Sequence, residues 1–171
     1  PGERALVIGD NGSGKTTLAN VLAGYFQPVA GQLLRPARIR AITLPLQFPP
    51  LKVRDLGADP VLLARLGMDG DGIADSLPET LSAGQQQKIA LAMVLGEDAD
   101  LYILDEPVAN LDTASREIAM DAIFARSHGR MLVMIMHGAE AYRARFDHVH
   151  ELGRSMWQPA RVTPVHVRGE A

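Results

Sequence analysis

The 171-residue sequence contains no cysteine, few aromatic residues and no long apolar run. Without cysteine there is no disulfide framework and no thiolate chemistry, a composition that suits a reducing compartment. The longest apolar candidates, around Ile89–Leu95 and Met131–Met136, stop far short of the ~20 residues that a membrane-spanning helix needs. An excess of positive charge is also missing, since the formal net charge is -3, and this disfavours a direct nucleic-acid role.

The chain also lacks a conventional start. The first four residues, PGER, lead straight into the apolar run Ala5–Ile8, with no Met and no basic, apolar leader peptide. We expect residues 1–171 to be a single domain, and a fragment that lacks the first strands of that domain.

Short apolar runs alternate with longer helical patterns, which predicts an α/β fold with a mostly parallel sheet flanked by helices. The expected strands are Arg4–Ile8, Ile39–Leu44, Leu101–Leu104 and Met131–Met136. The expected helices run from Gly14-Lys15 to about Gly24, around Val61–Leu66, from after Ser82 to Gly96, and over Thr113–Arg126. We expect the tail after Gly153 to be an edge strand or a loose terminus.

Residues 9–16, GDNGSGKT, match the phosphate-binding pattern G-x-x-x-x-G-K-[ST] between an expected strand and an expected helix. In such a P-loop the backbone N–H groups surround the β-phosphate, Lys15 reaches the β- and γ-phosphates, and the Thr16 hydroxyl binds Mg²⁺. The motif alone indicates a P-loop NTPase, a group that includes kinases, GTPases and motor proteins. The predicted nucleotide-binding residues are Gly9, Asn11, Gly12, Ser13, Gly14, Lys15, Thr16 and Thr17.

A pair of acids, Asp105 and Glu106, follows the apolar strand candidate Leu101–Leu104. This pair is similar to a Walker B segment, in which Asp105 holds Mg²⁺ and Glu106 polarises the attacking water as general base. Taken alone, a strand that ends in an acidic turn is equally well explained by structure, so the assignment depends on the other motifs.

The segment LSAGQ at 81–85 lies between the P-loop and the acid pair and opens an expected helix. In this order the motifs resemble the ABC ATPase family, whose signature reads LSGGQ. The resemblance implies a P-loop NTPase fold with a small helical subdomain that carries this motif. It also implies that Ser82, Ala83, Gly84 and Gln85 bind the γ-phosphate of ATP held by a second such domain.

Further family markers follow in order. Gln47 resembles the glutamine that contacts Mg²⁺ and the attacking water, Asp112 resembles the end of the loop that crosses the dimer interface, and His137 resembles the histidine that contacts the γ-phosphate. Taken singly, Gln47 is most often a loop glutamine and His137 a satisfied strand-end histidine; their joint order favours the family assignment. Glu106, His137 and Gln47 are thus the predicted catalytic residues, and Thr16, Gln47 and Asp105 the predicted metal-binding residues.

The sequence departs from the family pattern in several respects. Ala83 stands where the signature usually has glycine, and the interval from Gln47 to Ser82 is short, which implies an abbreviated helical subdomain over residues 48–95. The aromatic residue that stacks on adenine in this family is expected to lie before the chain. The segment after Gln47 looks like that of exporter-type domains fused to their membrane helices, whereas residues 105–112 are equally similar to separate ATPase subunits.

The resemblance implies an ATPase of an ABC transporter that uses Mg-ATP to close two domains head to tail and so drives transport. Its expected partners are a second ABC ATPase domain, identical or different, and a transmembrane domain, fused or separate, with no direct contact to nucleic acid. It is expected at the cytoplasmic face of a membrane, the bacterial inner membrane. The alternatives are a non-transport ABC ATPase that acts as an ATP-gated clamp on ribosomes or nucleic acid, and a regulatory domain that does not hydrolyse ATP.

Overall fold

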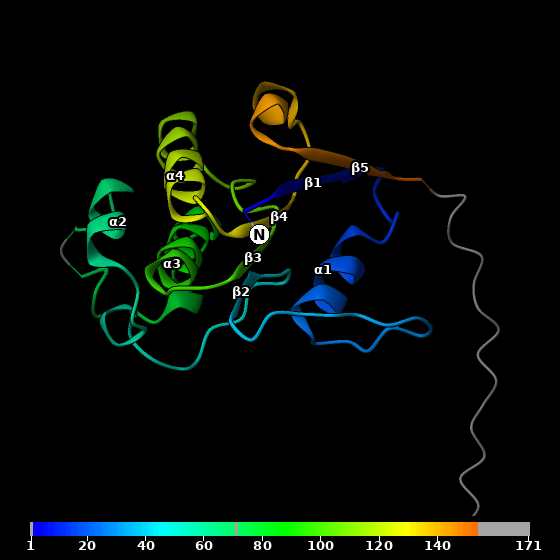
Figure 1. Ribbon diagram of the computed structural model, residues 1–171. Coiled ribbons are helices and arrows are strands. Elements are labelled where there is room, and N and C mark those ends of the chain that lie inside the picture. The colour runs from blue at the N-terminus through cyan, green and yellow to red at the C-terminus, as the bar shows by residue number, and fades with distance from the viewer. Residues whose placement is uncertain (1, 71, 154–171) are drawn as a thin grey trace, which may run out of the picture.

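The computed structural model describes residues 2–70 and 72–153, which build a parallel sheet with helices on both faces (Figure 1). The sheet has five strands in the order β2-β3-β4-β1-β5, and each neighbouring pair is parallel. The strands are β1 (Arg4–Gly9), β2 (Ile39–Ile42), β3 (Leu101–Asp105), β4 (Met131–Ile135) and β5 (His148–Leu152). Because all five run the same way, their carboxyl ends meet at one edge of the sheet, where open α/β folds bind ligands.

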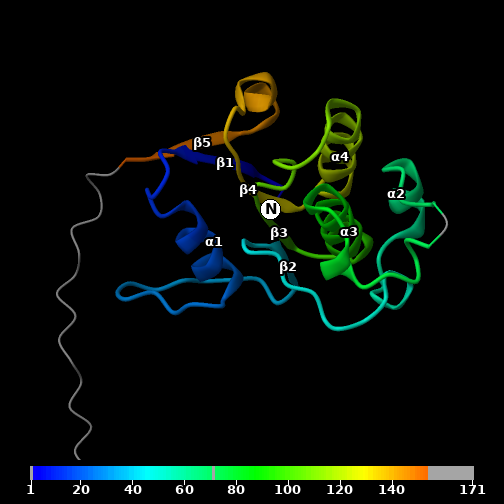
Figure 2. The same cartoon turned by 180° about the vertical axis from the view of Figure 1, so that it is seen from behind.

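The described residues form four α-helices, three of which pack on the sheet (Figure 1). They are α1 (Lys15–Ala23), α2 (Pro60–Arg65), α3 (Ala83–Gly96) and α4 (Thr113–Arg126), joined by 3-10 turns at Val53–Asp55, Pro78–Thr80 and Glu140–Arg145. Figures 1 and 2 show α1 on one face of the sheet, α3 and α4 on the other, and α2 beyond α3, away from the sheet. The helices therefore lie on both faces, as is usual for an all-parallel sheet.

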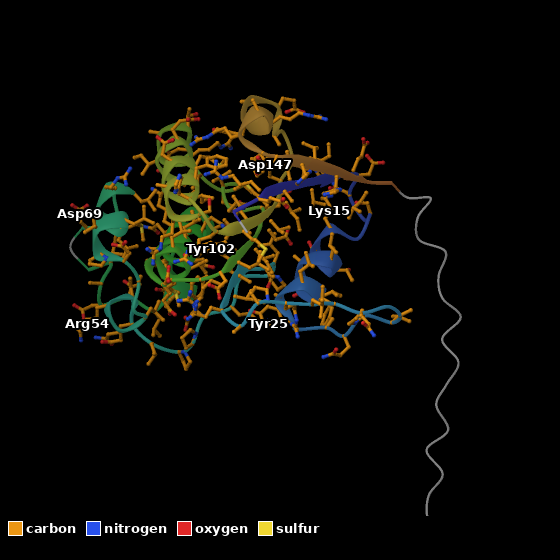
Figure 3. All side chains as sticks on the ribbon, in the orientation of Figure 1. Lys15, Tyr25, Arg54, Asp69, Tyr102 and Asp147 are labelled. Atoms are coloured by element: carbon orange, nitrogen blue, oxygen red, sulfur yellow. The ribbon has the colours of Figure 1, made fainter. Side chains whose placement is uncertain are left out.

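The strands alternate between two cores. In β1, Leu6 belongs to the core under α3 and α4, whereas the next residue, Val7, belongs to the core under α1. In β3, Tyr102 faces the first core and Ile103 the second, because successive strand side chains point to opposite faces. Tyr102 is fully buried near the middle of the molecule (Figure 3), and its hydroxyl donates to the Glu97 carbonyl, so its polar atom is satisfied.

The four predicted strands and four predicted helices are confirmed, with ends that differ by at most two residues. Gly24 ends α1 in a left-handed conformation, with φ of 90°, as its position predicts. The strand β5 (His148–Leu152) is absent from the sequence prediction. It is a mostly exposed edge strand whose sequence, HVHEL, has few apolar residues, so no buried face marks it. The tail predicted after Gly153 lies outside the described residues.

Residues 48–95 contain α2, two of the 3-10 turns and most of α3. Helix α2 packs on α3, and α3 packs on β2 and α4, so this segment shares the core under α3 and α4. Its treatment as a separate helical subdomain remains a prediction. Within residues 2–70 and 72–153, no helix combines the length and the apolar character that crossing a membrane would demand.

Candidate functional site

The loop between β1 and α1 passes close to the end of β5. A side chain at Gly9 would place its Cβ 2.4 Å from the Leu152 carbonyl oxygen, so only glycine fits there. Gly12 and Gly14 have φ of 79° and 94°, in the left-handed region that favours glycine. No side chain caps the N-terminus of α1, which leaves its first backbone N–H groups available to an anion.

The Lys15 side chain turns back over this loop. Its Nζ donates to the carbonyl oxygens of Gly9, at 2.8 Å, and Asp10, at 2.9 Å. The residue is 8% exposed at the start of α1 (Figure 3), so its charge is held by the loop rather than by bulk water. Within residues 2–70 and 72–153 this ammonium forms no ion pair with a carboxylate, so it is available within the loop to a phosphate.

Asp105, the last residue of β3, is a buried acid with an unmet hydrogen-bonding capacity. It is 1% exposed, and its Oδ2 has no hydrogen-bond partner among the described residues. Burial raises the pKa of this carboxyl, and the Thr16 hydroxyl and the charges of Lys15 and His137 oppose that rise. A buried, unpartnered oxygen beside a threonine hydroxyl is chemically suited to a hydrated divalent cation.

Glu106 follows directly and has a strained backbone. Its φ is 49°, which makes it the one non-glycine residue with a positive φ among the described residues. Its backbone N–H donates to the Ile135 carbonyl at 2.8 Å, and its Oε1 accepts from the backbone N–H of His137 at 3.1 Å. The His137 ring Nε2 lies 3.4 Å from the same oxygen. The turn thus aims the Glu106 carboxylate at the end of β4.

One cavity of about 320 Å³ joins these groups at the carboxyl edge of the sheet. Gly9 and Ser13 do not line it; Ser13 is buried in the loop, with its Oγ unpartnered. The lining residues are Asn11, Gly12, Gly14, Lys15, Thr16, Thr17, Asp105, Glu106 and His137. The structure therefore brings together seven of the predicted P-loop and metal-site positions with both predicted catalytic residues from the strand ends.

The same cavity fits Mg²⁺ bound with a nucleotide better than Mg²⁺ alone. The described ranges, 2–70 and 72–153, contain no cluster of three or more His, Asp or Glu side chains that could hold a metal ion. The protein offers a cation the Thr16 hydroxyl and the orphan oxygen of Asp105, so the phosphates and water must supply the remaining ligands. Mg²⁺ usually keeps several waters and binds through one or two protein oxygens and substrate phosphates.

The signature residues lie elsewhere, at the start of α3. The Ser82 Oγ accepts from the Gln85 backbone N–H at 3.3 Å, and the Gln85 Oε1 accepts from the Ser82 N–H at 3.0 Å, which completes a capping box. Neither these residues nor Ala83 and Gly84 line the P-loop cavity. Asp112 also caps a helix, accepting from the Ser115 N–H at the start of α4.

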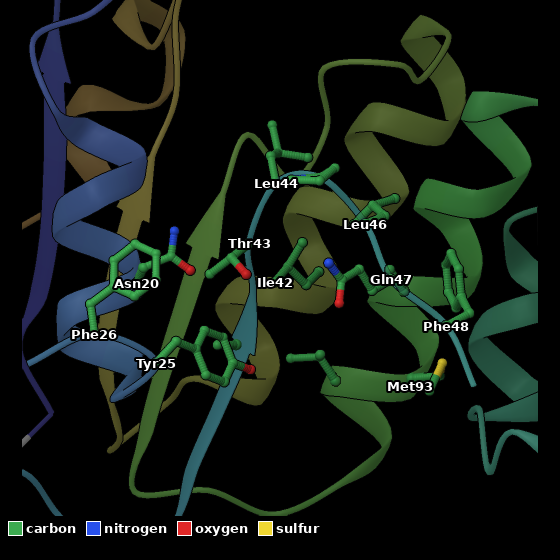
Figure 4. A pocket seen from close by; sticks show the side chains of 14 residues that line it. Asn20, Tyr25, Phe26, Ile42, Thr43, Leu44, Leu46, Gln47, Phe48 and Met93 are labelled. Carbon is green, nitrogen blue, oxygen red and sulfur yellow. The ribbon is translucent and has the colours of Figure 1, made fainter.

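Gln47 lines a second cavity, of about 460 Å³ (Figure 4), and is not among the residues that line the P-loop cavity. This cavity is bounded by the end of α1, by β2 and the loop after it, and by α3. Tyr25 and Phe26 line it and are 62% and 54% exposed. We did not predict these aromatics from the sequence. Two adjacent aromatics directly after a helix-ending glycine, in a chain with 5% aromatic residues, are the signal that could have identified them.

Comparison with known proteins identifies relatives of this chain. The family model described as ABC transporter matches residues 1–109. The chain is 33% identical to a phosphonates import ATP-binding protein of Pseudomonas syringae pv. syringae, over 86% of this chain and 71% of that protein. It is 29% identical to the "Probable D,D-dipeptide transport ATP-binding protein" of Escherichia coli (strain K12), over 86% of this chain.

Among solved structures, the chain resembles an RNase-L inhibitor with a TM-score of 0.69 and 29% identity. That match covers 78% of this chain and 28% of the inhibitor chain, and the chain spans 56% of the length of the dipeptide relative. The family match extends over more than half of the sequence and includes the P-loop, the signature segment and the acid pair. The chain therefore belongs to the ABC transporter family, as an ATP-binding ATPase domain with the P-loop NTPase fold.

Proposed function

We propose that this domain hydrolyses ATP between two ABC domains arranged head to tail, and that the resulting opening and closing drives transport. The proposal rests on one observation: the predicted nucleotide-binding residues lie in two separate places on the domain. Lys15, Thr16 and Glu106 line one cavity, whereas the signature residues open α3 and do not reach it. A second domain, identical or different, must then present its own signature residues to complete the site.

The residues of the cavity suit this chemistry. The Lys15 ammonium exchanges loop carbonyls for phosphate oxygens, and the free N–H groups at the start of α1 bind the same anion. The Glu106 carboxylate, anchored by the His137 N–H, accepts a proton from the attacking water. His137 donates to the γ-phosphate as negative charge develops. Thr16 and Asp105 would hold Mg²⁺ on the protein side, and the ion would neutralise phosphate charge.

A membrane partner fits the second cavity. Tyr25 and Phe26 present exposed apolar rings there, and Gln47 stands at the same place, between the sheet and the 48–95 segment. An inserted element of a transmembrane subunit would cover these rings and displace the Gln47 loop. The name of the phosphonates relative favours import over the exporter-type resemblance. We place the domain at the cytoplasmic face of a membrane, the bacterial inner membrane.

The proposal is tested by trapping the closed dimer. Glu106→Gln keeps the size of the side chain but removes the base, so ATP and Mg²⁺ should convert the variant into a long-lived dimer, measured by light scattering. Adding Lys15→Ala to this variant should abolish the dimer. A Glu106→Gln protein that binds ATP but stays monomeric at every ATP concentration overturns the head-to-tail arrangement.

An ATP-gated clamp on ribosomes or nucleic acid is the second candidate. The observation that favours it is the similarity to two solved structures. One is an RNase-L inhibitor, and the other is a complex of an archaeal ribosomal stalk protein with an archaeal ribosome recycling factor, matched with 28% identity and a TM-score of 0.69. Purification from native membranes and lysate separates the two functions. Retention of a multi-span membrane protein supports transport, whereas retention of ribosomes supports the clamp.

A further inference from the structure

We propose that Lys88 is a positioning residue that joins α2 to the turn formed by residues 109–112, so that movement of α2 shifts that turn. The effect on turnover rests on the function proposed above, because it requires the 109–112 turn to reach the second domain. The physical link itself is independent of that function.

The Lys88 side chain extends from α3 toward the ends of α2 and α4. Its Nζ donates to the carbonyl oxygen of Leu66, the residue that ends α2, at 2.7 Å. The same Nζ lies 3.9 Å from Asp112 Oδ2, the carboxylate that caps α4. One ammonium therefore interacts with the C-terminal end of α2 and the N-terminal end of α4.

The interactions of Lys88 with the Leu66 carbonyl and with the Asp112 carboxylate are both attractive. A cation at the C-terminal carbonyls of a helix complements the helix dipole, and a charged donor strengthens the hydrogen bond. The Lys88 side chain is only 16% exposed, so water and salt screen it less than they screen the surface pairs of this chain. Asp112 is 65% exposed, which makes its attraction the weaker of the two and the bond to Leu66 the stronger.

A second contact ties α3 to the same turn. A Cβ at Gly84 would lie 2.8 Å from the carbonyl oxygen of Asn110, so the turn rests directly on the backbone of α3. Gly84 and Lys88 are four residues apart and therefore share one face of the helix. The turn is thus packed against α3 at Gly84 and held electrostatically one helical turn later at Lys88.

Both the signature segment and the 109–112 turn are therefore attached to α3. Ser82 and Gly84 begin α3, and Lys88 on the same helix connects outward to α2. A partner that displaces α2 would therefore move the Leu66 carbonyl, and with it the Lys88 ammonium and the electrostatic support of Asp112. No other lysine can substitute, since the chain contains only Lys15, Lys52 and Lys88.

The link can be measured without ATP hydrolysis. The chain has no cysteine, so Val61→Cys on α2 and Ala114→Cys on α4, both exposed, provide two sites for nitroxide labels in the full chain. We expect Lys88→Met to broaden the distance distribution between the labels and Lys88→Arg to keep it narrow. Lys52→Met is the control: it removes a lysine that pairs with Asp75 at the surface and should leave the distance distribution narrow. An unchanged distribution in Lys88→Met overturns the proposal.

Kinetics then separate positioning from folding. In a hydrolytically active protein, Lys88→Met should lower kcat about tenfold with little change in KM for ATP, and Lys88→Arg should recover most of the loss. A broadened distribution with an unchanged kcat rejects the coupling while leaving the ATPase function intact. Absence of turnover in the unmodified protein contradicts the proposed function instead, and the label distances still decide the link. If Lys88→Met does not fold, Lys88→Gln replaces it.

Discussion

The Glu106 carboxylate and His137 are joined at the carboxyl edge of the sheet. The Glu106 Oε1 accepts the His137 backbone N–H at 3.1 Å and lies 3.4 Å from its ring Nε2. These residues follow neighbouring strands, β3 and β4, whose register places Asp105 opposite Ile135. The backbone bond orients the carboxylate, and the ring remains 53% exposed on the cavity side. Substitution of the His137 ring can therefore separate the orientation of Glu106 from the proposed contact of His137 with the γ-phosphate.

We expect His137→Ala to lose catalysis without losing stability. The backbone N–H that anchors Glu106 survives this substitution, and the exposed imidazole contributes little to packing. Turnover should fall by about 10²-fold, as for loss of one positioned donor or proton-transfer group, while the melting temperature stays the same. Steady-state ATPase assays and thermal melts check both parts. A matched drop in melting temperature would show that the loss is structural.

Substitution of Ser82 should separate helix capping from nucleotide recognition. Asp caps helices about as well as Ser, whereas Ala costs about 1 kcal/mol, so Ser82→Asp should keep the stability that Ser82→Ala loses. A carboxylate at this position would repel the phosphates of ATP bound to a second domain. We therefore expect Ser82→Asp, placed in the Glu106→Gln protein, to prevent the ATP-dependent dimer. Dimer formation at normal ATP concentrations would mean that the signature helix does not face the nucleotide.

Gly84→Ala should destabilise the protein, although alanine in place of glycine normally favours a helix by up to about 1 kcal/mol. The added Cβ would lie 2.8 Å from the Asn110 carbonyl oxygen. Because this oxygen belongs to the backbone, it cannot move aside by a rotamer change. Overpacking of this kind costs about 1–3 kcal/mol, so we expect a net loss on the order of 1 kcal/mol. Gly70→Ala is the control, since its Cβ would meet only Ile73 Cδ1 at 3.6 Å. Urea denaturation of the two variants gives the comparison, and equal midpoints contradict the close contact.

The surface cluster around Arg38 should make stability depend on pH. Arg38 donates hydrogen bonds to Asp100, which holds the pKa of that carboxyl below its ordinary value, and it pairs with Asp98 as well. A lowered carboxyl pKa adds stability that is complete above the ordinary value and is lost as the pH falls through the lowered one. Arg38→Met should therefore lower the free energy of unfolding more at about pH 7 than at about pH 3. Denaturation midpoints of the unmodified protein and Arg38→Met, measured at both pH values, test this prediction. The same difference between the two proteins at both pH values would contradict it.

Local sequence patterns determined much of the fold. The apolar runs that became β1 to β4 are long enough and buried enough to be recognised, and Gly24 and Ser82 mark helix ends by their chemistry. The edge strand β5 was not recognisable, because it is mostly exposed and carries His148, His150 and Glu151. Strand periodicity identifies a strand only where one face is buried.

The site was predictable in its motifs but not in its arrangement. The contiguous residues of the P-loop and the acid pair are identifiable because each step of the chemistry needs a particular residue type. The contact between Gly84 and Asn110, and the bond from Lys88 to Leu66, join residues that are 26 and 22 positions apart. No local pattern encodes such pairs. The placement of Gln47 in the second cavity likewise depends on how α1, β2 and α3 pack together.

The most direct measurement is steady-state ATP hydrolysis with Mg²⁺ by the unmodified protein, by Glu106→Gln, and by Glu97→Gln, whose surface carboxylate pairs with Arg40 near the opposite end of β3. We expect turnover in the unmodified protein and in Glu97→Gln, and its loss in Glu106→Gln with ATP binding retained. Turnover that persists in Glu106→Gln would contradict the assignment of Glu106 as the catalytic base.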